Sequence, residues 1–167
     1  MLTPDQVIRH LKLTPLTPEG GYYRETYRSD ETVAAGTLSA RYSGGRSMWA
    51  AIYFLLTPDA FSAMHRLSTD EVYHFYLGDP VELVELSPGA SSNVVSIGPN
   101  ILQGMMLQHV VRRGTWQGLR LAPGGKMALL GTTTAPGFDQ VDYEHGDKDR
   151  LLAEYPEAED LIRALTR

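Results

Sequence analysis

The 167-residue chain contains no cysteine, and this absence limits the chemistry available to it. Without thiolates there can be no disulfide framework, cysteine-based zinc site, iron–sulfur cluster or thiol nucleophile. No apolar run approaches the roughly 20 residues that a membrane-spanning helix requires. Acidic residues outnumber basic ones by 20 to 15. The resulting net charge of −5 is not typical of a protein that binds nucleic acid or an anionic membrane.

The sequence also lacks the pattern of a secretory signal peptide. Pro4, Asp5, Arg9 and His10 interrupt the N-terminal segment, where a signal peptide has a continuous apolar stretch. We therefore expect a folded, cytoplasmic protein with neither nucleic acid nor a membrane as its partner.

Glycine and proline are abundant, with 16 and 10 residues, and they are spread along the chain. This spacing is typical of turns between short strands and predicts about nine to eleven strands in a sandwich or barrel. We predict one all-β domain with short helices at its ends: residues 1–17 form a helix and linker, 18–144 a β-barrel, and 145–167 C-terminal helices. The strands are expected at residues 22–27, 37–42, 48–56, 61–65, 71–77, 81–86, 93–97, 107–111, 115–121, 127–133 and 140–143.

Capping signals mark the helical ends of the chain. Thr3 and Gln6 have the spacing of a capping box, with proline at the first helical position. Asp147 is suited to cap a helix that carries Leu151, and Pro156 is suited to begin another.

The most informative segment is the pair of expected strands on either side of residues 66–70. Side chains alternate along a strand, so Glu71 and Tyr73 share one face, and His65 faces the same interior if the turn reverses the chain. An imidazole and a carboxylate are costly to bury unless they are paired, hydrogen-bonded or bound to a metal. His65 and Glu71 are therefore candidate functional residues.

This segment resembles the first motif of the cupin superfamily, which reads His-x-His, three residues, Glu, six residues, Gly. The chain has His65, Glu71 and Gly78 at the matching spacing, with Leu67 at the position of the second histidine. The second cupin motif, Pro-x-Gly-x-x-His, resembles residues 112–117. There the glycine is retained, while arginine and glutamine replace the proline and histidine.

Four segments resemble one branch of small single-domain cupins of unassigned biochemical function. They are residues 18–27 (Pro-Glu-Gly-Gly-Tyr-Tyr-Arg-Glu-Thr-Tyr), 70–74, 115–117 and 135–138. The resemblance implies a double-stranded β-helix, a jelly-roll-like barrel, with an interior pocket for a small molecule. It also implies a homodimer.

The resemblance bears on metal binding as well. Metal-binding cupins typically supply three histidines and a glutamate, and by position this set becomes His65, Glu71 and Gln117, because Leu67 has no donor. An amide oxygen is a weak ligand for iron, nickel or zinc beside imidazole. No metal or other cofactor is favoured, and a divalent metal on this reduced ligand set stays as an alternative. His109 is a further candidate metal ligand, although the sequence does not determine the register of its strand.

Without a metal, the same residues form an acid–base set. His65 is the candidate base, Glu71 the group that orients it, and Tyr73 the candidate acid. The resemblance points the same way, since some metal-free cupins that epimerise or isomerise nucleotide sugars use a histidine base and a tyrosine acid. The alternatives are a cupin that binds a ligand without catalysis, a metal-dependent enzyme, and a buried polar network with no chemistry.

Further residues are candidates for contacting a ligand. Arg24 could bind a carboxylate or phosphate as a bidentate donor, although a charged residue on a half-exposed strand is the simpler interpretation. Aromatic residues could line the cavity, although they are more often part of a core. The candidate ligand-binding residues are Tyr23, Arg24, Glu25, Phe61, Gln108, Trp116, Gln117 and Phe138.

Overall fold

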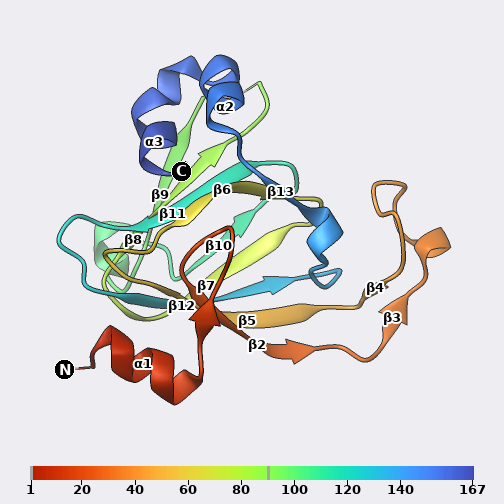
Figure 1. The fold of residues 1–167 in the computed structure, drawn as a ribbon, viewed down its shortest axis with the longest axis horizontal. Coiled ribbons are helices and arrows are strands. Elements are labelled where there is room, and N and C mark those ends of the chain that lie inside the picture. Colours follow the sequence, from red (N-terminus) through yellow and green to blue (C-terminus); the bar gives the residue numbers. More distant parts are fainter. Residues whose placement is uncertain (1, 90) are drawn as a thin grey trace.

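Two antiparallel β-sheets packed face to face form the body of the protein (Figure 1). The structure is a computed structural model that describes residues 2–89 and 91–167. The six-stranded sheet has the order β1 (Thr14–Pro15), β2 (Tyr22–Arg28), β5 (Ala50–Leu56), β12 (Ala128–Thr134), β7 (Glu71–Gly78) and β10 (Gln108–Val111). The five-stranded sheet has the order β13 (Tyr143–His145), β6 (Ser62–Leu67), β11 (Trp116–Leu121), β8 (Val81–Leu86) and β9 (Asn93–Ile97).

Short elements complete the chain around the two sheets. A separate two-stranded ribbon consists of β3 (Thr32–Val33) and β4 (Arg46–Ser47). The α-helices are α1 (Pro4–Leu11), α2 (Lys148–Glu154) and α3 (Glu159–Ala164). Single 3₁₀ turns are η1 (Ala35–Thr37), η2 (Ile101–Gln103), η3 (Gln140–Asp142) and η4 (Pro156–Ala158). None of the helices described is long and apolar enough to cross a membrane.

The main core lies between the two sheets and follows from alternation along the strands. Phe54 and Leu130 from the six-stranded sheet pack against Leu83 and Leu119 from the five-stranded sheet. Since successive side chains of a strand point to opposite faces, each sheet has a second apolar face that must also be covered. The helices at the two ends of the chain cover those outer faces.

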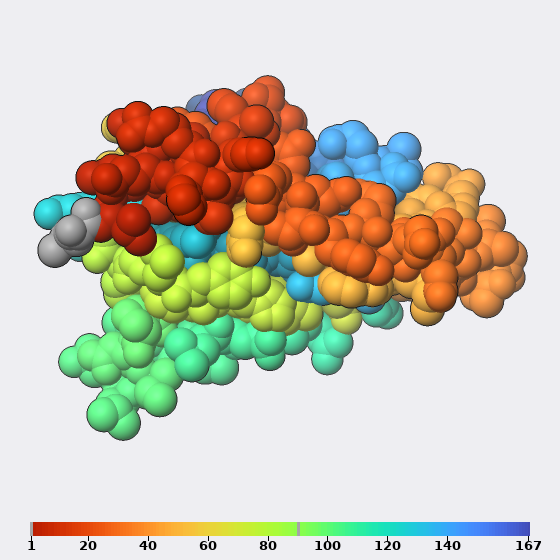
Figure 2. Space-filling view, turned by 90° about the horizontal axis from the view of Figure 1, so that it is seen from below, coloured from red at the N-terminus to blue at the C-terminus, as the bar shows by residue number. Residues whose placement is uncertain are grey.

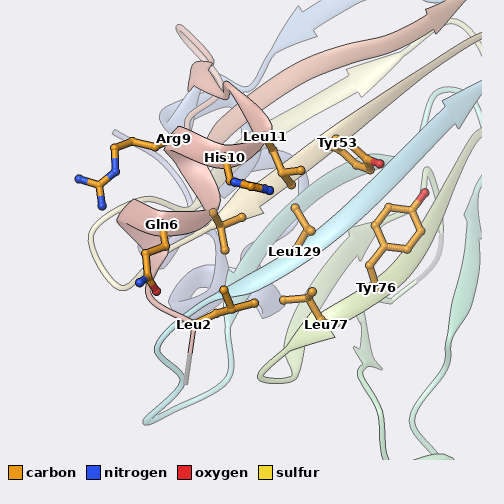
Figure 3. Close-up of a pocket in the computed structure, with 10 residues that line it drawn as sticks. Leu2, Gln6, Arg9, His10, Leu11, Tyr53, Tyr76, Leu77 and Leu129 are labelled. Atoms are coloured by element: carbon orange, nitrogen blue, oxygen red, sulfur yellow. The ribbon is translucent and has the colours of Figure 1, made fainter.

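Helix α1 covers part of the outer face of the six-stranded sheet, at the bottom of Figure 1. Its capping box is confirmed: the Gln6 amide donates to Thr3 Oγ1 and the Thr3 amide donates to Gln6 Oε1. Val7 packs on Leu55 and Leu129 of the sheet. A groove of about 890 Å³ remains between helix and sheet, with Tyr53 and Tyr76 along its side (Figure 3).

Helices α2 and α3 cover the outer face of the five-stranded sheet, at the top of Figure 1. Asp147 caps α2 by accepting a hydrogen bond from the Arg150 amide at 2.8 Å. Leu151 and Ile162 pack on Met64 and Trp116 of the sheet. The helix capped by Asp147 is confirmed, while Pro156 begins the 3₁₀ turn η4, and α3 follows it from Glu159.

Two of the expected strands differ in the structure. The strand predicted at residues 37–42 is wrong, because this segment forms the end of η1 and a turn instead. Tyr42 is buried beneath the guanidinium groups of Arg41 and Arg46, so its apolar character anchors a loop rather than a sheet. Near the other end, residues 140–142 form η3, and the last strand is shifted to Tyr143–His145. The sheets also begin earlier than expected, because β1 lies in the segment predicted as a linker.

Large apolar side chains are exposed on the edge strands β9 and β10 and on the segment between them. Figure 2 shows the part near residue 100, in green, projecting from the rest of the molecule. An exposed apolar edge is a usual place for association between chains. The expected homodimer stays a prediction. The exposed side chains are Val94, Ile101, Leu102, Met106, Leu107 and Val110.

A buried ion pair joins the β3–β4 ribbon to the loop before β13. Arg46 Nε and Nη2 donate to the two carboxylate oxygens of Asp142, each at 2.7 Å. The side chains are only 3% and 4% exposed, so neither charge can be hydrated if its partner is lost.

We expect Arg46→Met to lower the free energy of unfolding by about 3 kcal/mol, because it leaves the Asp142 carboxylate buried without a cation. Urea unfolding measures this change. Adding Asp142→Leu to Arg46→Met should recover much of the loss. The control Arg163→Met removes an exposed pair with Glu159 and should change stability little. An Arg46→Met protein as stable as the parent would show that the pair does not hold the ribbon.

Candidate functional site

A row of polar side chains crosses the inner face of each sheet, and the two rows face each other. In the five-stranded sheet, His145, His65, Gln117, Glu85 and Asn93 are cross-strand neighbours in that order. In the six-stranded sheet, Thr134 is the neighbour of Glu71, and Thr132 is the neighbour of Tyr73. The space between the sheets is therefore apolar toward Leu83 and polar toward His65.

A cavity of about 90 Å³ lies at the polar end of this interior space. Strands of both sheets and the loop before β2 line it. The lining residues are Leu16, Glu19, Tyr23, Glu25, Ala50, Ile52, Phe54, His65, Leu67, Glu71, Tyr73, Thr132, Thr134 and Phe138.

The His65 ring is held in one tautomer by the backbone of its own strand. Its Nδ1 lies 2.8 Å from the carbonyl oxygen of Ala63, and because a carbonyl only accepts, Nδ1 must carry the proton. In the neutral ring the free lone pair is then on Nε2. This nitrogen lies 4.0 Å from Glu19 Oε2, and the side chain is 2% exposed. The ring also stacks on Tyr143, with centroids 5.3 Å apart.

Glu19 is held beside the His65 ring by contacts with β6. Its Oε1 accepts a hydrogen bond from Ser62 Oγ at 2.8 Å, which leaves Oε2 near the imidazole. The backbone around Glu19 is held as well, because Arg167 donates to the carbonyls of Pro18 and Phe61.

Glu71 is a buried carboxylate with a neutral hydrogen-bond partner. Gln117 Nε2 donates to Glu71 Oε2 at 2.8 Å across the space between the sheets. Burial raises the pKa of Glu71, and the charge of Glu19 also raises it. A charge on His65 and hydrogen bonds from Thr132 and Gln117 act in the opposite direction. Glu71 thus favours its protonated form more than a glutamate in water does.

Tyr73 remains a phenol throughout the ordinary pH range. Burial raises its pKa well above the usual value, and the charges of Glu71 and Glu19 raise it further. A phenol that keeps its proton is suited to donate a hydrogen bond to an oxygen that gains negative charge.

The structure brings together six of the residues predicted from the sequence. His65, Glu71 and Tyr73 line the cavity with Tyr23, Glu25 and Phe138. Gln117 lies directly behind them and is 1% exposed. The orienting role expected for Glu71 falls on other groups, because the contacts of the His65 ring are to Ala63, Glu19 and Tyr143.

Four predicted ligand-binding residues lie away from the cavity. Arg24 is on the outer face of the six-stranded sheet, with its guanidinium over the Tyr53 ring. Gln108 is on that same face and bonds to His74. Trp116 packs against α2 and α3 on the outer face of the other sheet, and Phe61 lies beneath Arg167. Arg24, Gln108 and Trp116 lie on strands, where a shift of one residue moves a side chain from the inner to the outer face of the sheet.

Sequence reasoning missed several residues that line the cavity. Glu19 lies in the segment that carried the family resemblance, but nothing local showed that its side chain turns inward. Thr132 and Thr134 had a weak signal: they are hydroxyl residues two apart on a strand whose preceding members are buried and apolar. The alternative donor His109 pairs instead with Glu85, at 3.1 Å.

Comparison with known proteins agrees with this architecture. A family model described as Cupin superfamily (DUF985) matches residues 5–146. The chain belongs to the cupin superfamily. No curated protein sequence matches it.

Two solved structures resemble this cupin over nearly its whole length. A hypothetical protein from Leishmania major is 30% identical, with 99% of each chain covered and a TM-score of 0.90. A protein from Shewanella oneidensis is 31% identical, with 100% of this chain and 99% of that chain covered and a TM-score of 0.86. Oxalate decarboxylase from Bacillus subtilis shares the fold at 14% identity, with 93% of this chain and 37% of that chain covered and a TM-score of 0.54.

The donor set of this cupin does not fit a tightly bound metal. In the parts of the chain that are described, no group of three or more His, Asp or Glu side chains is arranged to hold one. Leu67 contributes an apolar wall where a second histidine would be needed. Gln117 presents its amide nitrogen, not its oxygen, toward Glu71.

We expect Glu71→Gln to make this cupin more stable at about pH 8 and to lose that advantage toward about pH 4. A carboxyl group whose pKa is raised on folding favours the folded state below its unfolded pKa. That contribution is lost as the pH rises through the folded value. Urea unfolding at several pH values measures the difference. Glu157→Gln, at an exposed position, is the control and should show no such trend. A stability difference independent of pH would contradict the raised pKa.

Proposed function

We propose that this cupin binds a small molecule in its interior cavity and exchanges a proton with it through His65, as an isomerase or epimerase does. The observation that carries this proposal is the hydrogen bond from His65 Nδ1 to the Ala63 carbonyl, which puts the free lone pair on Nε2. A buried imidazole in a fixed tautomer is suited to remove a proton from a bound carbon acid.

Tyr73 supplies the complementary acid in this proposal. When a base removes a proton next to a carbonyl group, negative charge develops on the carbonyl oxygen. A buried phenol can stabilise that oxygen by donating its proton to it or sharing it. Because burial and the two nearby carboxylates raise its pKa, the Tyr73 phenol is protonated whenever the ligand binds.

The volume of the cavity limits the size of the substrate. Its volume of about 90 Å³ is well below the roughly 300–1,000 Å³ of pockets that hold drug-sized ligands. At about 10–15 Å³ for each water-sized group, it holds on the order of six such groups. The substrate is therefore far smaller than a nucleotide sugar.

Exchange of carbon-bound hydrogen tests the proposal directly. The purified protein is incubated in heavy water with hydroxyacetone or dihydroxyacetone, and NMR measures deuterium entering the carbon next to the carbonyl. We expect His65→Gln to lower the rate by about 100-fold or more, since it removes the base. His10→Gln, on the far side of the six-stranded sheet, is the matched control and should leave the rate unchanged.

Two outcomes would contradict the proposal. Equal exchange by the parent and His65→Gln would remove His65 from the reaction. Binding of these compounds without any exchange by the parent would show a binding cupin with no proton transfer.

We expect Tyr73→Phe to lower the exchange rate by about 100-fold while the protein stays folded, because the ring is kept and only the hydroxyl is lost. Tyr53→Phe, on the outer face of the same sheet, is the control. Circular dichroism and thermal unfolding check that both variants are folded. A Tyr73→Phe protein with the parent's rate would exclude the phenol as the acid.

A further inference from the structure

The charges that line the interior cavity are unbalanced. Three carboxylates line it, those of Glu19, Glu25 and Glu71, and in the described part of the chain no lysine or arginine does. Glu25 is half-exposed and is neutralised by Arg28, whose Nη2 lies 2.7 Å from Glu25 Oε2. Arg167 donates to the backbone carbonyls of Pro18, next to Glu19, and of Phe61. Among the described residues that line the cavity, His65 is the one basic side chain that accompanies Glu19 and Glu71.

A hydroxyl group in the same cavity lacks a partner. Thr134 lines the cavity, is 4% exposed, and is the cross-strand neighbour of Glu71. Its Oγ1 makes no hydrogen bond to any residue that the structure describes. Buried hydroxyl groups are usually hydrogen-bonded, so an unpaired one beside a carboxylate marks a place for a ligand donor.

The rest of the wall suits a cation with an apolar body. Tyr23, Phe54, Tyr73 and Phe138 line the cavity, and the faces of aromatic rings attract positive charge. Ile52 and Leu67 offer apolar contact. An anion, in contrast, would be placed among carboxylates, and no lysine or arginine is found among the described residues that line the cavity. The repulsion there is strong because water is excluded.

We propose that the ligand is a small primary ammonium compound of about six non-hydrogen atoms, with its ammonium group beside Glu71 and Thr134. This names the ligand class for the cavity and so rests on the proposed function. The three N–H groups of an ammonium match the acceptors available there: the two carboxylates and Thr134 Oγ1. Moving an ammonium group from water into a protein interior costs free energy, and this cost is offset only where such acceptors are already in place.

Three inert probes of similar shape test the charge preference. They are isobutylammonium, isobutanol and isobutyrate, and binding to the purified protein is followed by calorimetry and by the shift of the thermal unfolding midpoint. We expect isobutylammonium to bind about tenfold or more tightly than isobutanol, and isobutyrate not to bind at millimolar concentration. None of the probes is an aldehyde or a ketone, so binding is measured apart from proton exchange.

Two variants test whether Glu71 and Thr134 cause the preference for an ammonium group over a neutral hydroxyl group. Glu71→Gln and Thr134→Val each keep the shape of the side chain and should each reduce the ammonium preference about tenfold, with isobutanol affinity unchanged. Glu157→Gln, exposed on η4, is the control for net charge and should change nothing. Retention of the full preference by both Glu71→Gln and Thr134→Val would overturn the assignment.

The outcomes separate the two proposals. Equal affinity for isobutylammonium and isobutanol would overturn the ammonium preference and leave proton exchange at His65 intact. Binding of isobutyrate in preference to both would overturn it as well. If none of the probes binds, the ammonium proposal fails, and deuterium exchange still decides separately whether His65 transfers a proton.

Discussion

The burial of two carboxylates and an imidazole between two β-sheets is the constraint on which the site depends. Ionisable groups in such a place are tolerated when each has a partner, and here both carboxylates have partners that are distant in sequence. Glu19 is held by Ser62, and Glu71 is held by Gln117. His65 is held by the carbonyl of Ala63. These contacts fix the orientation of each group and leave Nε2 of the ring toward the cavity.

The fold was largely predictable from the sequence because it rests on short-range rules. Turn residues bracket the strands, and capping residues mark the helical ends, as at Thr3 and Asp147. The segment at residues 37–42 was the exception: it precedes a Ser-Gly-Gly turn signal, as a hairpin strand does, but forms a loop around the buried Tyr42. Arg41 and Arg46 pack their guanidinium groups over the Tyr42 ring. Such packing within a loop leaves no periodic pattern in the sequence from which it could be predicted.

The site was predictable only as far as strand alternation and family motifs reach. His65, Glu71 and Tyr73 were placed on one interior surface because strand alternation directs them there if the turn at residues 66–70 reverses the chain. In the structure, β6 and β7 belong to opposite sheets, and these side chains meet across the space between the sheets. Glu19 could not be placed, since its position depends on contacts with Ser62 and Arg167, which are distant in sequence. Arg24 and Trp116 show the reverse error: their chemistry suggested a ligand contact, but their register directs them outward.

The position of β12 has a consequence for how the protein is made. In the six-stranded sheet, β12 lies between β5 and β7 and pairs with both along its length (Figure 1). A nascent chain that has emerged only through residue 127 has no strand to join β5 to β7, and it lacks Thr132, Thr134 and Phe138 from the cavity wall. Pairings over such sequence separations form slowly because a long loop must close first. During synthesis the carboxylates of Glu19 and Glu71 therefore stay hydrated until late, and the cost of burying them arises only when β12 is inserted.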